Sequence, residues 1–250
     1  MVSVTQRIGK ITQPKGGYIN PKQFSVIEID DNLEFKEENI HASLVGLAVD
    51  YLTRFNNGAT AEDAFKISLL GAEIIDHESI AESILKNLKG LDDNSIISAC
   101  KLSGFDVCFR ANPMGYRPVE DINPDENTIE NIRIMVNRSL SFIKEYGPVV
   151  KDGFTFSGGY TDVVNTGDGD FLTNDTLWDF KVSKDNPTNK HTLQILMYYL
   201  MGIHSINPEF KSIRYLGIFN PRLNKVYRLE IEKIDEAIIS QVEKEVICYS

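Results

Sequence analysis

The spacing of apolar residues changes near residue 149, and this change limits the folds that the chain can adopt. Before it, apolar residues recur every three or four positions, which places them on one face of an α-helix. After it, short apolar and β-branched runs alternate with Gly-Gly and Gly-Asp-Gly-Asp, the pattern of strands joined by tight turns. We therefore predict a mainly helical region over residues 1–147 and a sheet-containing core over residues 148–250.

The first region carries end signals as well as a helical period. Thr60 is followed by Glu62 and Asp63, acidic residues that favour the start of a helix. Gly90 and Gly104 are stop signals. The expected helices lie within residues 38–58, 60–76, 77–90, 92–110 and 128–146.

The second region predicts a mixed sheet flanked by helices, an α/β fold of the α+β type. Its expected strands cover residues 153–165, 170–174, 176–182, 212–219 and 225–231. Its expected helices cover residues 188–205 and 233–247.

Charge and composition exclude several classes of protein. The net charge is −10, and neither residues 1–150 nor residues 151–250 have a basic excess, so nucleic-acid binding would have to depend on local basic groups and bound cations. Three isolated cysteines without CxxC spacing indicate neither a disulfide framework nor a zinc site. No apolar run approaches twenty residues and no signal-peptide pattern follows Met1, so we expect a cytoplasmic protein without a membrane partner.

An acid and a lysine end the apolar run of the expected strand at 176–182. Asp179 and Lys181 are two residues apart, so on a strand their side chains point to the same face. Opposite charges on a buried strand are costly unless they bind something. The alternative is that Asp179 and Lys181 form an ordinary surface ion pair, which stabilises a protein very little.

Three further residues make the functional interpretation more specific. Asp162 ends an earlier apolar run behind Gly158 and Gly159, and the turn Asn-Thr-Gly-Asp-Gly-Asp predicts a hairpin that brings this acid near Asp179. The next helix presents Gln194 and Tyr198 four residues apart, on one face. Taken singly, Asp162 could terminate a strand, and the other two could be ordinary helix residues.

Two carboxylates beside a backbone carbonyl form the hard oxygen site that Mg²⁺ or Mn²⁺ prefers. We expect Asp162, Asp179 and the carbonyl of Phe180 to supply these ligands. Such a cation binds a phosphodiester, lowers the pKa of water and stabilises charge on phosphorus. Lys181 would orient or deprotonate the water, or stabilise the transition state.

The arrangement resembles the PD-(D/E)XK nuclease superfamily, and within it the RecB-like exonuclease branch. The residues that carry the resemblance are Gly159-Tyr160-Thr161-Asp162, Asp179-Phe180-Lys181, and Gln194 to Tyr198. The resemblance covers residues 150–205 and implies a restriction-endonuclease-like core behind a helical N-terminal region. It also implies metal binding by Asp162, Asp179 and the Phe180 carbonyl, catalysis by Lys181, and active-site support by Gln194 and Tyr198.

The chain departs from this branch at two points. A helix reading G-x-x-x-H supplies a histidine ligand in many members, whereas here Gly46 is followed four residues later by Asp50. Asp50 is either an oxygen ligand in that place or a residue of a polar face. Some relatives carry a four-cysteine iron–sulfur cluster, which three scattered cysteines do not supply.

Candidate substrate contacts lie outside these motifs. Arg110, Tyr116 and Arg117 in "FRANPMGYRPV" could grip a strand by charge and stacking, or could tether the two halves of the chain. His191, one turn before Gln194, is either a phosphate contact or an exposed residue at a helix start.

These features favour a metal-dependent deoxyribonuclease, an exonuclease acting on single- or double-stranded DNA ends. The main alternative is a catalytically inactive nuclease-fold protein that binds protein or nucleic acid, which the acidic composition favours. A metal-dependent hydrolase of another class has little support without a histidine cluster. By analogy with toroidal relatives, a homo-oligomeric ring is compatible with this interpretation.

Overall fold

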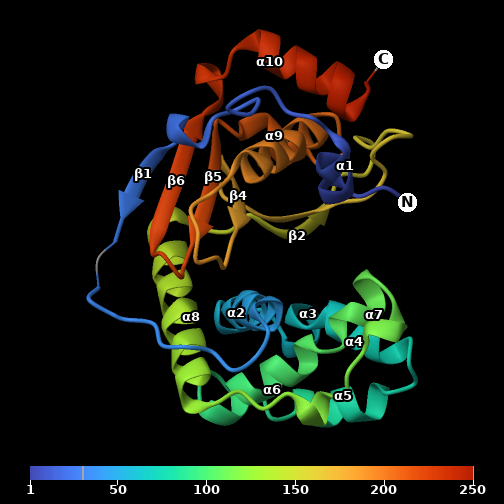
Figure 1. Ribbon diagram of the computed structural model, residues 1–250, viewed down its shortest axis with the longest axis vertical. Coiled ribbons are helices and arrows are strands. Elements are labelled where there is room, and N and C mark those ends of the chain that lie inside the picture. The colour runs from blue at the N-terminus through green and yellow to red at the C-terminus, as the bar shows by residue number, and fades with distance from the viewer. Residues whose placement is uncertain (30, 250) are drawn as a thin grey trace. The chain divides into compact units, whose positions relative to one another are not determined.

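The structure is a computed structural model that describes residues 1–29 and 31–249. The chain forms two compact units (Figure 1). The sheet unit comprises Met1–Ile29 and Ile143–Ser250, and the helical unit comprises Asp30–Phe142. These boundaries differ from the division expected at residue 147, because the N-terminal segment joins the sheet instead of the helices.

The helical unit contains the helices that the apolar spacing predicts, two of them divided into shorter pieces. The expected helix at 60–76 is interrupted at Phe65, and the one at 92–110 is interrupted after Gly104. The helices are α2 (Ala42–Asn56), α3 (Ala61–Ala64), α4 (Lys66–Glu73), α5 (Glu78–Leu85), α6 (Asp93–Ser103), α7 (Asp106–Arg110) and α8 (Glu126–Tyr146), of which α8 belongs to this unit as far as Phe142. Short 3-10 turns lie at Pro113–Gly115 and Val119–Asp121.

A buried carboxylate connects three helices of this unit. Asp106 is 2% exposed, and its two oxygens accept hydrogen bonds from the hydroxyls of Tyr51 at 2.5 Å and Ser68 at 2.6 Å. Arg110 adds an ion pair at 3.1 Å. Burial raises the pKa of Asp106, and these hydrogen bonds and the arginine oppose that rise. The network satisfies a charge that would otherwise destabilise the helical unit.

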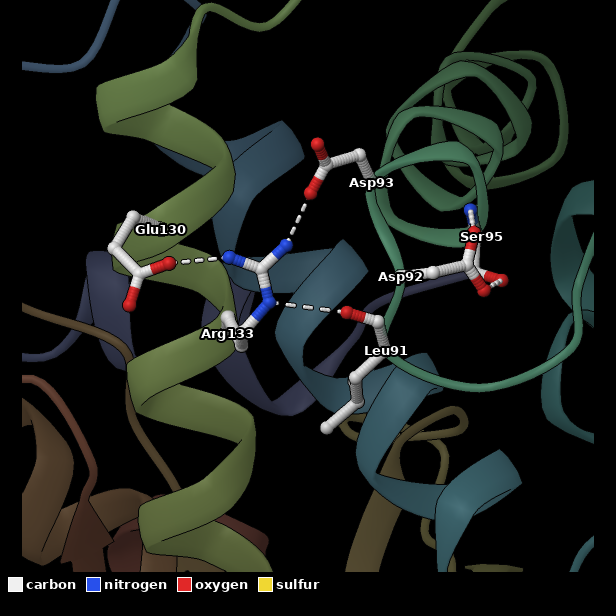
Figure 2. A network of polar contacts seen from close by, with 6 residues as sticks. All are labelled: Leu91, Asp92, Asp93, Ser95, Glu130 and Arg133. Atoms are coloured by element: carbon white, nitrogen blue, oxygen red, sulfur yellow. Dashed lines mark hydrogen bonds and ion pairs between the residues drawn. The ribbon is translucent and has the colours of Figure 1, made fainter.

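An exposed ion-pair network joins α8 to the start of α6. Figure 2 shows the guanidinium of Arg133 directed toward Asp93, Glu130 and the carbonyl of Leu91. Asp93 is 73% exposed, in contrast with Asp106. Exposed ion pairs are screened by water, so this network contributes less to stability than its geometry suggests.

We expect Asp106→Ala to lower the free energy of unfolding by several kcal/mol, because each buried hydroxyl left unpaired costs about 1–3 kcal/mol. Asp93→Ala is the matched control, with an expected cost below about 1 kcal/mol. Urea unfolding followed by circular dichroism at pH 7 measures both. Equal losses in the two variants would contradict the structural role assigned to Asp106.

The strands of the sheet unit form one mixed sheet in the order β1-β6-β5-β4-β3-β2 (Figure 1). They are β1 (Ser25–Glu28), β2 (Lys151–Thr155), β3 (Asp168–Leu172), β4 (Thr176–Phe180), β5 (Tyr215–Asn220) and β6 (Lys225–Glu230). Strands β4 and β5 are parallel, and the other neighbouring pairs are antiparallel. The mixed α/β class predicted from the sequence is therefore confirmed.

Helix α9 (Asn189–Ile203) connects β4 to β5 and packs against both (Figure 1). Its inner residues form one apolar core with Leu172 of β3, Leu177 of β4 and Leu216 of β5. Helix α1 (Val4–Lys10) contacts α9, as does the π-helical turn at Val242–Ile247 that continues α10 (Glu236–Gln241). Short 3-10 turns occur at Pro21–Gln23, Pro208–Ser212 and Ile231–Lys233.

The strand expected over residues 153–165 is wrong beyond Thr155, because β2 ends there. Gly158 then adopts a positive φ of 88°, a conformation that side chains rarely tolerate. At Gly159 the backbone passes so close to α9 that a Cβ would overlap the Met201 carbonyl. The chain thus leaves the sheet and forms a loop that returns at β3.

No helix among the described residues has both the length and the apolar composition needed to cross a membrane.

Candidate functional site

Asp179 is a buried carboxylate near the end of β4. Leu177 faces the apolar core beneath α9, and alternate residues of a strand share a face, so Asp179 and Lys181 follow on that same side. Asp179 is 1% exposed, and its Oδ1 accepts a hydrogen bond from Lys181 Nζ at 2.9 Å. Its Oδ2 is buried without a hydrogen-bond partner among the described residues. A buried carboxylate oxygen without a partner is costly and calls for an explanation.

The acid opposite Asp179 is Asp170 of β3. The two strands pair Phe171 with Trp178 and Leu172 with Leu177, and the next step of this register places Asp170 opposite Asp179. The side-chain Oδ2 of Asp170 accepts a hydrogen bond from the backbone N–H of Phe180 at 2.6 Å, which agrees with this placement.

The face beneath α9 changes from apolar to charged along the two strands. The opposed pair Leu172 and Leu177 is buried in the core. Two residues further along each strand, on the same face, lie Asp170 and Asp179. Another two residues along, the same register brings Asp168 toward Lys181. The sheet therefore carries an acidic pair immediately beside its apolar core, in which Asp179 is buried and Asp170 is half-buried.

Helix α9 presents two polar residues to this acidic pair. Gln194 Nε2 donates a hydrogen bond to the Tyr198 hydroxyl at 2.8 Å, and both residues are buried. Burial raises the pKa of Tyr198, and nearby carboxylates raise it further. Those carboxylates are Asp179, Asp170 and Asp168. The hydroxyl consequently stays neutral, and since it accepts from Gln194 it retains its own hydrogen for donation.

His191 lies on the same face of α9, and the charges of Asp179 and Lys181 both influence the pKa of its imidazole. Burial lowers the pKa of His191, and Lys181 lowers it further. The Phe180 ring packs against Phe219 at 5.9 Å between centroids, while the assignment of its carbonyl as a metal ligand stays a prediction.

Asp162 occupies a different environment from the one expected. It is exposed, in a turn where the Thr161 N–H donates to the Val164 carbonyl at 2.9 Å. The Thr161 hydroxyl fixes this turn to the Ile247 carbonyl at 2.6 Å. The expected hairpin that would bring Asp162 to Asp179 is wrong, because the Asn-Thr-Gly-Asp-Gly-Asp segment leads into β3 instead of joining two strands there.

Asp170 was missed by the sequence interpretation, although a signal for it exists. Gly167-Asp168-Gly169-Asp170 has the same G-x-x-D spacing as Gly159 to Asp162. It also opens the strand that directly precedes the one ending in Asp179 and Lys181, with a turn of three residues between them. Adjacent antiparallel strands bring opposed residues together, so this copy of the motif was the better candidate.

The remaining predicted residues belong to the helical unit, and three of them have contacts there. Asp50 pairs with Arg54 at 3.1 Å on α2. Arg110 is part of the Asp106 network, and Tyr116 stacks on Phe105 with 5.6 Å between centroids. Arg117 is exposed. Metal binding by Asp50 and substrate binding by the other three stay predictions.

The donor set of the sheet unit suits a hard cation. Asp170 and Asp179 offer carboxylate oxygens side by side, and the buried, unpartnered Oδ2 of Asp179 fits a ligand that approaches from α9's side of the sheet. Within the described ranges, no three His, Cys, Asp or Glu side chains gather as a ready metal cage. The two acids would therefore form an open set, completed by water or substrate oxygens as Mg²⁺ sites commonly are.

Comparison with known proteins adds no relative: no family model, no curated protein and no solved structure matches this chain.

Proposed function

We propose that the protein is a metal-dependent nuclease that hydrolyses phosphodiester bonds of DNA, acting as an exonuclease. The observation that carries the proposal is the acidic pair of Asp170 and Asp179, with a buried Asp179 oxygen that lacks a hydrogen-bond partner. A lysine 2.9 Å from the other oxygen of Asp179 completes the set. Two acids and a lysine at this spacing on neighbouring strands are suited to phosphoryl chemistry.

Each residue has a definite part in this mechanism. Asp170 and Asp179 would hold Mg²⁺ or Mn²⁺, which supplies Lewis-acid stabilisation of the phosphate and lowers the pKa of water. Lys181, held by Asp179, orients the attacking water and offsets the negative charge that grows on the phosphate. The Asp170 carboxylate is fixed by the Phe180 N–H, so it enters the site in one orientation.

Residues of α9 complete the site from the opposite side. Tyr198 remains neutral and can donate its hydroxyl hydrogen to a carboxylate or phosphate oxygen, while Gln194 fixes its orientation. The order of elements also supports a restriction-endonuclease-like core: antiparallel β2, β3 and β4, then α9, then β5 parallel to β4.

The test is Mg²⁺-dependent cleavage of end-labelled DNA, single- and double-stranded, linear and circular. Release of nucleotides from linear DNA alone is the expected result. Cleavage of circular DNA would replace the exonuclease assignment with an endonuclease. RNA of the same sequence serves as a further substrate, and preferential cleavage of RNA would overturn the choice of DNA.

Cation binding separates this proposal from an inactive nuclease-fold protein. Mn²⁺ at about 100 times its Kd should stabilise the folded protein by about 2.7 kcal/mol. Thermal unfolding with and without Mn²⁺ measures this effect. The absence of both stabilisation and cleavage in purified protein would favour the inactive binding module.

A further inference from the structure

His191 is placed to contact whatever the acidic pair holds. It is the third residue of α9, one turn before Gln194 and two turns before Tyr198, so the three side chains share a face of the helix. The ring is partly buried and lies within reach of the charges of Lys181 and Asp179.

A backbone hydrogen bond fixes the tautomer of this histidine. Nδ1 accepts from the N–H of Thr188 at 3.1 Å, so Nδ1 carries no hydrogen. In the neutral ring the hydrogen is then on Nε2, which becomes a donor. Burial and the charge of Lys181 favour this neutral form by lowering the pKa of His191.

We propose that His191 is a substrate-binding residue whose Nε2–H donates to one non-bridging oxygen of the phosphate held at Asp170 and Asp179. This inference rests on the proposed nuclease function. A neutral donor adds direction without adding charge, so it selects one of the two non-bridging oxygens. Lys181 supplies the positive charge, and the histidine fixes how the phosphate is turned.

Replacing His191 by Gln or by Glu, which are nearly isosteric with each other, distinguishes the substrate contact from the capping role of His191 at the start of α9. Gln and Glu at the third helical position both accept a hydrogen bond from the N-cap backbone, so both preserve the start of α9. Only Gln keeps an N–H that can reach the substrate. We expect His191→Gln to retain most of kcat/KM and His191→Glu to lose about 10- to 100-fold, the worth of one hydrogen bond to a charged group.

A purely structural histidine would give another result. Because a carboxylate near a helix N-terminus is favourable, Glu should stabilise α9 at least as well as Gln. In thermal unfolding the Glu variant should therefore be at least as stable as the Gln variant, whereas the Gln variant should have the higher kcat/KM. Equal activity of both variants and wild type would overturn the inference.

The carboxylate of His191→Glu could also lower activity simply by repelling the phosphate. Replacing a phosphate oxygen of the substrate by sulfur tests the hydrogen bond without introducing this charge. A phosphorothioate at the cleaved linkage weakens a hydrogen bond to the replaced oxygen, and Mn²⁺ tolerates sulfur better than Mg²⁺ does. In Mn²⁺ we expect wild type to discriminate between the two phosphorothioate diastereomers and His191→Ala to lose this discrimination. Persistence of the same discrimination in His191→Ala would overturn the contact, whereas a wild type that cleaves no DNA would overturn the proposed function itself.

Discussion

Asp179→Asn is expected to lower kcat for DNA cleavage by roughly a thousandfold, because several kcal/mol of charge stabilisation depends on the cation that Asp179 would hold. The amide still accepts a hydrogen bond from Lys181, so the local structure is preserved. Asn removes the buried negative charge but keeps a polar atom at the Oδ2 position, so the metal-free variant should still fold. End-labelled linear DNA with saturating Mg²⁺ measures the rate.

The same variant should lose stabilisation by Mn²⁺ in thermal unfolding. Lys181→Met is the matched comparison, since it alters the other member of the 2.9 Å pair. Removal of a positive charge beside Asp179 does not weaken cation binding, so this variant should keep stabilisation by Mn²⁺ while losing cleavage. If Asp179→Asn retains both properties, the carboxylate is a structural residue and the proposed function is wrong.

Local spacing was sufficient to predict much of this molecule. The helices of the first region and α9 have apolar residues at helical spacing, which identifies a helix from local sequence alone, although two of the expected helices are divided into shorter pieces. The i, i+4 pair Gln194 and Tyr198 is a local relation, so its hydrogen bond follows from the helix itself. The shared face of Asp179 and Lys181 follows in the same way from the period of a strand.

Short elements were missed because their stability comes from distant parts of the chain. Strand β1 has four residues, all exposed, and it forms through its antiparallel pairing with β6 about two hundred residues away. Helix α1 has seven residues, and its buried Val4 and Ile8 pack into the core shared with α9. Neither segment carries a pattern long enough to identify it without its partner.

The identity of the second acid depends on the pairing of two strands. The G-x-x-D motif occurs at Gly159 to Asp162 and again at Gly167 to Asp170, so the motif alone does not select between them. The selection comes from the short turn between β3 and β4, which sets the register. Gly158 and Gly159 have a separate use, because they carry the chain away from the sheet and against α9.

A comparison of substitutions at Asp170 and Asp162 is the most direct test of the site. Asp170→Asn should lower kcat by roughly a thousandfold, as a cation ligand would. Its amide oxygen can still accept from the Phe180 N–H, so folding is preserved. Asp162→Asn should leave both cleavage and stability unchanged, within about 0.5 kcal/mol for a surface substitution. Initial rates on linear DNA and thermal unfolding measure the pair.

The comparison is well matched because the chemical change is the same, and each acid ends a G-x-x-D motif. The two positions differ in environment: Asp170 lies opposite Asp179 in the sheet, and Asp162 lies exposed in a turn. A loss of activity confined to Asp170→Asn would therefore show that the second acid of the site is the one that the pairing of β3 and β4 places opposite Asp179. Loss confined to Asp162→Asn would show that the loop between β2 and β3 supplies the second ligand, and that the Asp170 carboxylate serves only to hold the Phe180 N–H.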